Sequence, residues 1–181
     1  NELDDKCIMA MNFYTPWQFT VCGISDTWSY DGEVKQQMDE YFARLIELRE
    51  VLGIPIIITE YGVGSDENCM ASKNKLDVCE YIYFVMKWFY DNNFAAFIWD
   101  PGYIIHRDSF NYGIPFWGNI VENVIIGGEY DIADDYINHE EDITFLPYTT
   151  PQPTTLKDIE ALDNVSLLSI TTEDNTSVSI I

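Results

Sequence analysis

Hydrophobic positions along the chain alternate between continuous apolar runs and stretches with helical spacing. Continuous runs at residues 7–13, 54–58 and 94–99 are typical of strands buried in a parallel sheet. Apolar residues recur every three or four positions over 34–52, as on one face of a helix. A second helix is expected over 72–90, where apolar residues lie on several sides, and it should be largely buried. A last short helix is expected over 114–125. This repeated order of strand and helix predicts a parallel sheet covered by helices.

Two architectures fit this order: an open doubly wound sheet and part of a (β/α)8 barrel. No glycine-rich phosphate loop follows any of the predicted strands, which weakens the nucleotide-binding version. In both architectures the functional residues gather at the carboxyl ends of the strands. The strand ends are therefore the places to look for chemistry.

The character of the chain changes after residue 126, and the sequence predicts three parts. Residues 1–126 form the α/β part. Residues 127–155 hold an acidic segment without a clear period, followed by an extended Thr/Pro linker at 148–155. Residues 156–181 are rich in Ser and Thr and form either a tail or the start of an appended module.

The chain is strongly acidic, with 31 acidic and 9 basic residues and a formal net charge of -22. Phosphates would be repelled, so we expect no nucleic-acid partner and no binding to anionic membranes. A neutral partner such as a carbohydrate meets no such repulsion. No apolar run approaches the length of a membrane span, so no membrane partner is expected.

The cysteines and histidines give no metal pattern. The four cysteines form no CxxC pair and have no zinc-like spacing with the two histidines, so neither a metal nor a cofactor is expected. The spacing favours ordinary thiols and leaves one bridge open. The chain reaches its first predicted strand within a few residues, and we therefore expect it to be a portion of a longer protein.

Each predicted strand ends in residues that can do chemistry. Asn12 and Tyr14 follow the first strand, Glu60 ends the second, and Trp99 and Asp100 end the third. One carboxylate at a strand end is ordinarily a helix cap or an ion-pair partner. Three such ends on one edge of a sheet favour a binding or catalytic site instead.

These strand ends carry a resemblance to a known family. The segments "MNFYTPWQFT", "GIPIIITEYG" and "FAAFIWDPG" resemble the last third of a glycoside hydrolase family 5 catalytic barrel, in its endo-β-1,4-glucanase and xyloglucanase-like branch. The resemblance covers residues 7–125. It implies an α/β fold made of the C-terminal three βα units of a TIM (β/α)8 barrel, incomplete and followed by the Thr/Pro linker and tail.

The resemblance also implies roles for three residues. Glu60 matches the nucleophile, Tyr14 matches a tyrosine that hydrogen-bonds it, and Trp99 matches the floor of the subsite beside the scissile bond. A phenol that donates to a carboxylate favours its ionised, nucleophilic form. An indole offers a flat apolar surface to the C–H face of a sugar ring.

Other aromatic residues and two departures from the family pattern complete the candidate site. Trp17 and Trp28 either extend the substrate platform or pack within their loop, and Trp117 is expected in the core. Asn12 stands where the family has a histidine that organises hydrogen bonds around the substrate. Pro101 stands where the family has an asparagine.

The resemblance implies a retaining endo-β-glucanase that is secreted and hydrolyses β-1,4-linked polysaccharide, with β-glucan as its partner. Its acid/base glutamate belongs to an Asn-Glu-Pro triplet that this sequence does not contain. We expect it in the N-terminal part of the barrel, and we expect the chain alone to be inactive because the mechanism needs two carboxyl groups.

Two other interpretations stay open at this stage. The first is a non-catalytic carbohydrate-binding protein derived from such a barrel, which Asn12 and Pro101 suggest. The second is a small α/β domain in which Glu60 is a cap and no sugar binds. Measurements of polysaccharide hydrolysis and of sugar affinity distinguish these three interpretations.

Overall fold

The computed structural model describes residues 6–21, 24–64, 67–106, 109–128, 130–145, 170–171 and 177–178. The chain divides into two units, Asn1–Tyr148 and Thr149–Ile181. In the second unit β6 (Ile170–Thr171) pairs antiparallel with β7 (Ser177–Val178). The predicted Thr/Pro linker at 148–155 lies outside the described residues, as does most of the predicted tail.

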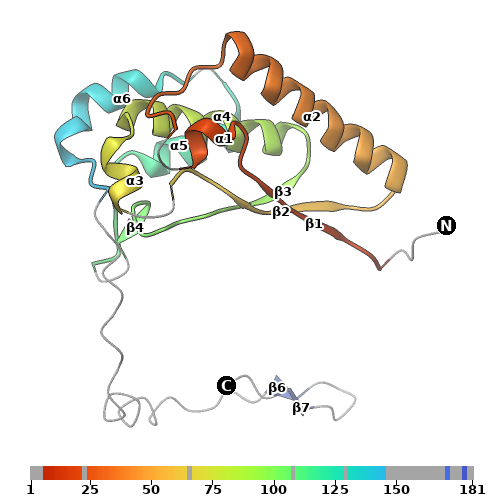
Figure 1. The fold of residues 1–181 in the computed structure, drawn as a ribbon. Coiled ribbons are helices and arrows are strands. Elements are labelled where there is room, and N and C mark those ends of the chain that lie inside the picture. Colours follow the sequence, from red (N-terminus) through yellow and green to blue (C-terminus); the bar gives the residue numbers. More distant parts are fainter. Residues whose placement is uncertain are drawn as a thin grey trace. The chain divides into compact units, whose positions relative to one another are not determined.

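The first unit is built on a parallel three-stranded sheet, as the apolar runs predict. Its strands are β1 (Met9–Phe13), β2 (Ile56–Tyr61) and β3 (Ala95–Ile98), in the order β1-β2-β3. Figure 1 shows the three strands side by side, with the helices of this unit above them. β2 is central, so both of its backbone edges are paired.

Long helices connect the strands, again close to the prediction. α2 (Gly32–Leu52) follows β1 and α4 (Lys75–Asp91) follows β2. α2 ends at Gly53, whose φ of 65° is left-handed and suits a residue without Cβ. α4 begins at Asn74, whose side chain accepts a hydrogen bond from the backbone N–H of Asp77. After β3 comes α5 (Trp117–Ile126), the predicted last helix.

Several short elements lie in segments where the sequence predicts only loops. They are α1 (Trp17–Thr20), α3 (Glu67–Ser72), the antiparallel pair β4 (Ile105–His106) and β5 (Asn111–Tyr112), and the 3-10 helix η1 (Glu140–Asp142). Each has six residues or fewer, which is too short for apolar periodicity to reveal.

The acidic segment after 126 contains a helix. α6 (Ile132–His139) forms within it, capped by the side chain of Asp131, which accepts from the N–H of Ala133. Ile132 is buried, and the ring of Tyr130 packs edge-on against Tyr83 of α4. This segment therefore packs against the α/β part. Within α6, Ile132 is buried and Tyr136 is partly buried against the core, and two such residues produce no visible period.

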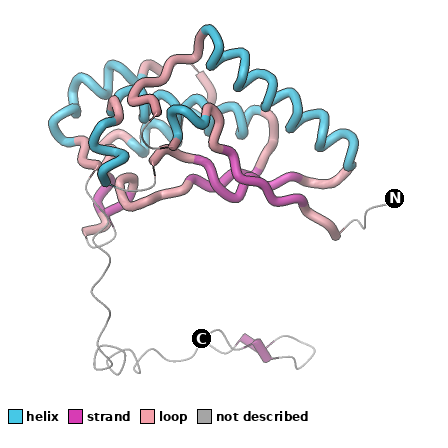
Figure 2. Tube along the Cα trace, in the orientation of Figure 1, coloured by secondary structure: helices cyan, strands magenta, loops and turns pink. Residues whose placement is uncertain are grey.

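The described helices cover one face of the sheet, as Figures 1 and 2 both show. On that face Phe13, Ile58 and Phe89 belong to the hydrophobic core. The other face, which we call the open face, carries side chains that alternate with the core residues along each strand. These are Ala10, Asn12, Thr59, Phe97 and Trp99, all exposed.

Candidate active site

A β-bulge turns Glu60 toward the open face. Along β2, Ile56 and Ile58 are buried, so strict alternation would bury Glu60 as well. In the pairing with β1, however, Ile58 lies opposite Met11 and Glu60 lies opposite Asn12, which leaves Thr59 as an extra residue. The bulge moves Glu60 to the open face beside Asn12 and places Tyr61 in the core.

The carboxylate of Glu60 receives two hydrogen bonds from β1 and the residues after it. The amide Nδ2 of Asn12 donates to Oε2 over 3.1 Å, and the hydroxyl of Tyr14 donates to the same oxygen over 3.1 Å. The structure thus brings Asn12, Tyr14 and Glu60 together, as the sequence predicts. Both donors converge on one carboxylate oxygen.

Thr59 orients this arrangement, and the sequence analysis did not assign it a role. Its hydroxyl lies 2.7 Å from Oδ1 of Asn12 and 3.1 Å from the carbonyl oxygen of Met11. A hydrogen bond to Oδ1 leaves the Asn12 amide NH₂ directed at Glu60. Two consecutive polar residues between Ile58 and Tyr61 are the sequence signal that marks the bulge.

Tyr14 remains a hydrogen-bond donor over the whole neutral range. Burial, the hydrogen bond to Glu60 and the negative charge of Glu60, in that order, raise the pKa of Tyr14 to about 12. The phenol therefore keeps its proton and donates to the carboxylate at any pH near neutrality.

Contacts from three other elements fix the loop that carries Tyr14. The hydroxyl of Tyr81 in α4 donates to the carbonyl of Thr15 over 3.0 Å, and the hydroxyl of Thr20 donates to the carbonyl of Tyr14 over 2.8 Å. The backbone N–H of Gly64, after β2, donates to the carbonyl of Thr20 over 2.9 Å. The chain after β1 is thereby tied to α4 and to the end of β2.

Trp99 stands next to the end of β2. Its backbone N–H donates to the carbonyl of Tyr61 over 2.7 Å, and its side chain is 43% exposed. Gly62 permits this approach, since a Cβ there would lie only 3.0 Å from the carbonyl oxygen of Trp99. The adjacent Asp100 acts on its own loop: Oδ1 accepts from the N–H groups of Gly102 and Ile104.

The two tryptophans of the loop after β1 have opposite environments. Trp17 in α1 is 58% exposed, as a platform residue would be. Trp28 is only 8% exposed, and its ring packs edge-on against Tyr81 with 5.6 Å between centroids. This burial fits packing of the Trp28 ring within its loop, and a place for Trp28 in the substrate platform at Glu60 stays a prediction. Its backbone N–H is held by the carboxylate of Asp77 at 2.8 Å, which draws the residue toward α4.

The remaining predicted features are placed as follows. Trp117 is in the core, as expected. Cys69 forms a disulfide and Cys7 and Cys79 are free, so the preference for thiols was wrong for Cys69; Cys22 lies outside the described residues. Over the described residues we find no group of His, Cys, Asp and Glu that could hold a metal ion.

The structure resembles part of several solved endoglucanases. One endoglucanase aligns with a TM-score of 0.53 and 19% identity, over 70% of this chain and 41% of its own. A hyperthermophilic endo-β-1,4-glucanase in complex with substrate gives 0.52 and 18%, over 70% and 41%. A mutant form of Thermotoga maritima Cel5A in complex with cellobiose gives 0.51 and 15%, over 65% and 39%. No protein-family model and no curated protein matches the sequence.

The chain shares part of its fold with these endoglucanases. At these low identities the likeness concerns the fold, and this chain spans about 41% of the first endoglucanase. A parallel sheet with helices that matches two fifths of such a chain fits the predicted partial (β/α)8 barrel. No described helix is long and apolar enough to cross a membrane.

Proposed function

We propose that this chain is part of the catalytic domain of a retaining endo-β-1,4-glucanase of the glycoside hydrolase family 5 type, with Glu60 as its nucleophile. The supporting observation is the asymmetry of the carboxylate. Oε2 accepts from both Asn12 and Tyr14, whereas Oε1 accepts from none of the described residues. A nucleophilic carboxylate needs this division, with one oxygen held and the other free to attack.

In the proposed reaction Oε1 of Glu60 attacks the anomeric carbon and forms a covalent glycosyl-enzyme, which water then hydrolyses. Asn12 and Tyr14 hold Oε2 and keep the attacking oxygen directed at the sugar. Retention needs a second carboxyl group about 5–5.5 Å away to protonate the leaving oxygen. We propose that a strand of the barrel other than β1, β2 and β3 contributes it.

The proposed substrate is a neutral β-1,4-glucan. The exposed indole of Trp99 beside the site offers an apolar face to a sugar ring, and Trp17 offers another further along the loop. The net charge of -22 opposes anionic polysaccharides. The structures of similar fold that hold cellobiose or a substrate support this choice.

We propose that the protein is secreted and that the Thr/Pro stretch links the barrel to an appended module. The disulfide at Cys69 supports the location, because disulfides persist in oxidising compartments. In the same environment the free Cys79 is protected by burial.

A mechanism-based inactivator tests the nucleophile directly. A 2,4-dinitrophenyl 2-deoxy-2-fluoro-β-cellobioside carries a leaving group that departs without protonation, so labelling does not require the second carboxyl group. We expect the 181-residue chain to gain the mass of one fluorocellobiosyl group, and we expect peptide mapping to place it on Glu60. Glu60→Gln should abolish the labelling.

Labelling of another carboxylate would overturn the assignment of Glu60. Binding of cellobiose without labelling would favour the alternative, a non-catalytic carbohydrate-binding protein. The observation that favours this alternative is Asn12, whose amide contacts Glu60 at the position of the family's histidine.

A further inference from the structure

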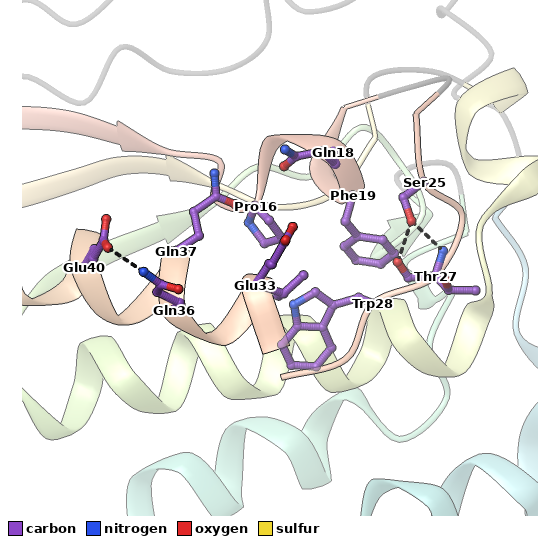
Figure 3. A pocket seen from close by; sticks show the side chains of 11 residues that line it. Pro16, Gln18, Phe19, Ser25, Thr27, Trp28, Glu33, Gln36, Gln37 and Glu40 are labelled. Atoms are coloured by element: carbon purple, nitrogen blue, oxygen red, sulfur yellow. Dashed lines mark hydrogen bonds between the residues drawn. The ribbon is translucent and has the colours of Figure 1, made fainter. Parts of the chain in front are cut away.

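A cavity lies between α1 and the start of α2. It encloses about 400 Å³, which is within the range of small-ligand pockets. Pro16, Gln18 and Phe19 form one wall, and the first turns of α2 form the other. Figure 3 shows these side chains facing one another across the cavity, with Trp28 at its base.

The indole N–H of Trp28 is an unused donor in this cavity. The residue is 92% buried, since its exposed fraction is 8%, and Nε1 has no hydrogen-bond partner in the described part of the chain. In Figure 3 the nitrogen edge of the ring is directed toward the space between Pro16 and Glu33. A buried donor without a partner costs free energy, and an acceptor on a ligand would remove that cost.

The other polar groups of the cavity supply both donors and acceptors. Gln18 and Gln37 carry side-chain amides, and Glu33 and Glu40 carry carboxylates. The amide of Gln36 is already engaged, because Nε2 donates to Oε1 of Glu40 over 3.2 Å. The apolar part of the lining comes from Phe19, Val34, Pro16 and the indole ring.

This combination selects the chemical class of the ligand. An anion would be repelled by Glu33 and Glu40 and by the net charge of the chain. A cation brings only donors and leaves the N–H of Trp28 unpaired. A hydroxyl group both accepts and donates, and a sugar ring adds an apolar C–H face for the aromatic wall.

We propose that this cavity is a second carbohydrate-binding site, which takes one or two sugar units of the polysaccharide and is separate from the site at Glu60. The choice of a β-1,4-linked sugar rests on the proposed function, whereas the choice of a neutral polyhydroxy ligand rests on the cavity. Such a site would hold a polysaccharide chain beside the barrel while the site at Glu60 acts on it.

Nuclear magnetic resonance of the indole N–H groups tests the proposal in the 181-residue chain. The chain has five tryptophans, so each side-chain signal can be assigned by substitution. During a titration with cellobiose we expect the Trp28 signal to shift and to saturate. Glu60→Gln should leave this shift unchanged, because the two sites share no residue.

Substitutions in the cavity should weaken binding by about fivefold each, as expected for the loss of one hydrogen bond. Gln37→Ala removes a lining amide and Glu33→Gln removes a lining charge. Glu33 is exposed and Gln37 is partly exposed, so the fold should tolerate both changes. Glu47→Gln, an exposed position on the same helix outside the cavity, should leave the affinity unchanged. Trp28→Phe removes the indole N–H donor, and calorimetry measures the resulting change in the affinity for cellobiose.

The possible results separate this proposal from the function proposed above. A stationary Trp28 signal while Glu60 is still labelled would overturn the second site alone. A Trp28 shift without labelling of Glu60 would support the second site and count against the nucleophile. If spermidine shifts Trp28 and cellobiose does not, the cavity binds cations and the proposal is wrong.

Discussion

The two faces of the three-stranded sheet have opposite contents. The covered face is apolar and buried under helices. Phe89 of α4 packs on this side and is 1% exposed, and its ring contacts those of Phe13, Phe42, Tyr61, Trp88 and Phe94. The open face carries Asn12, Thr59, Glu60 and Trp99, and its polar groups bond to one another. One face supplies the folding free energy, and the other holds the groups that can react.

The comparison also shows how one strand serves both faces. β2 sends Ile58 and Tyr61 into the core and Glu60 to the open face, and the bulge that leaves Thr59 outside the pairing preserves both orientations. The proposed nucleophile thus lies at a local irregularity of the strand.

Deletion of Thr59 tests the bulge that serves the two faces. Glu60 then follows Ile58 directly, so regular alternation should still direct Glu60 to the open face and Tyr61 to the core. We expect labelling by the fluorocellobioside to persist, and we expect the free energy of unfolding to fall by about 1 kcal/mol, because the hydrogen bonds of the Thr59 hydroxyl are lost. Urea unfolding and mass spectrometry measure the two effects.

Thr59→Ala is the matched control for this deletion. It keeps the residue count and loses only the bonds of the hydroxyl, so it should cost about 1 kcal/mol and retain labelling. If the deletion abolishes labelling and Thr59→Ala does not, the extra residue itself is needed to direct Glu60 to the open face.

Phe89→Ala and Phe97→Ala compare the two faces with the same substitution. Phe89 is buried, and its loss should lower the free energy of unfolding by roughly 4 kcal/mol. Phe97 lies on the open face and is 60% exposed, so its loss should cost less than about 0.5 kcal/mol. Equal costs in urea unfolding would show that the open face is covered in solution.

Lys73→Met should have an intermediate effect. Lys73 is buried beside the loop that holds Trp17 and Trp28, and its Nζ donates to the carbonyls of Val21, over 3.3 Å, and Ser25. Removing it leaves these acceptors unpaired and should cost about 2 kcal/mol. Lys35→Met breaks an exposed pair with Asp39 and should cost less than about 0.5 kcal/mol. If Lys73→Met lowers the free energy of unfolding no more than Lys35→Met does, Lys73 does not stabilise this loop.

The smallest effect concerns the proton of Tyr14. Its pKa of about 12 lies above the ordinary 10.0, so the stability from this group is complete below pH 10 and is lost as the pH rises toward 12. In Glu60→Gln the pKa of Tyr14 should fall but stay above 10.0, because burial, the largest cause, remains. Carbon-13 resonances of the tyrosine rings report this pKa, and an unchanged value would show that Glu60 does not contact Tyr14.

The sequence allowed much of this architecture to be predicted, because its signals are local. The apolar runs and the helical spacing locate the sheet and its long helices, and Asn12, Tyr14 and Glu60 meet as expected because parallel strands end at one edge. The bulge at Thr59 was missed because the continuous apolar run before it shows no alternation in which an extra residue could be detected.

Two other features depend on contacts distant in the sequence. Trp17 and Trp28 both lie in the stretch between β1 and α2. Trp28 is held by contacts with Asp77 and Tyr81, about fifty residues away in the sequence, and its indole is buried, whereas the indole of Trp17 is exposed. Docking of α6 depends in the same way on α4, since α6 packs against α4 and Tyr130, just before α6, contacts Tyr83. Neither partner can be identified from the local pattern.

The order of the sheet has a consequence for how this chain behaves at high concentration. β1 and β3 each present an outer row of backbone groups that no described strand pairs, and such rows recruit other strands. The net charge of -22 keeps neighbouring copies apart, but salt screens this repulsion beyond roughly 10 Å. The colloidal stability of the chain should therefore decrease with ionic strength, and light scattering at low and high salt would follow it.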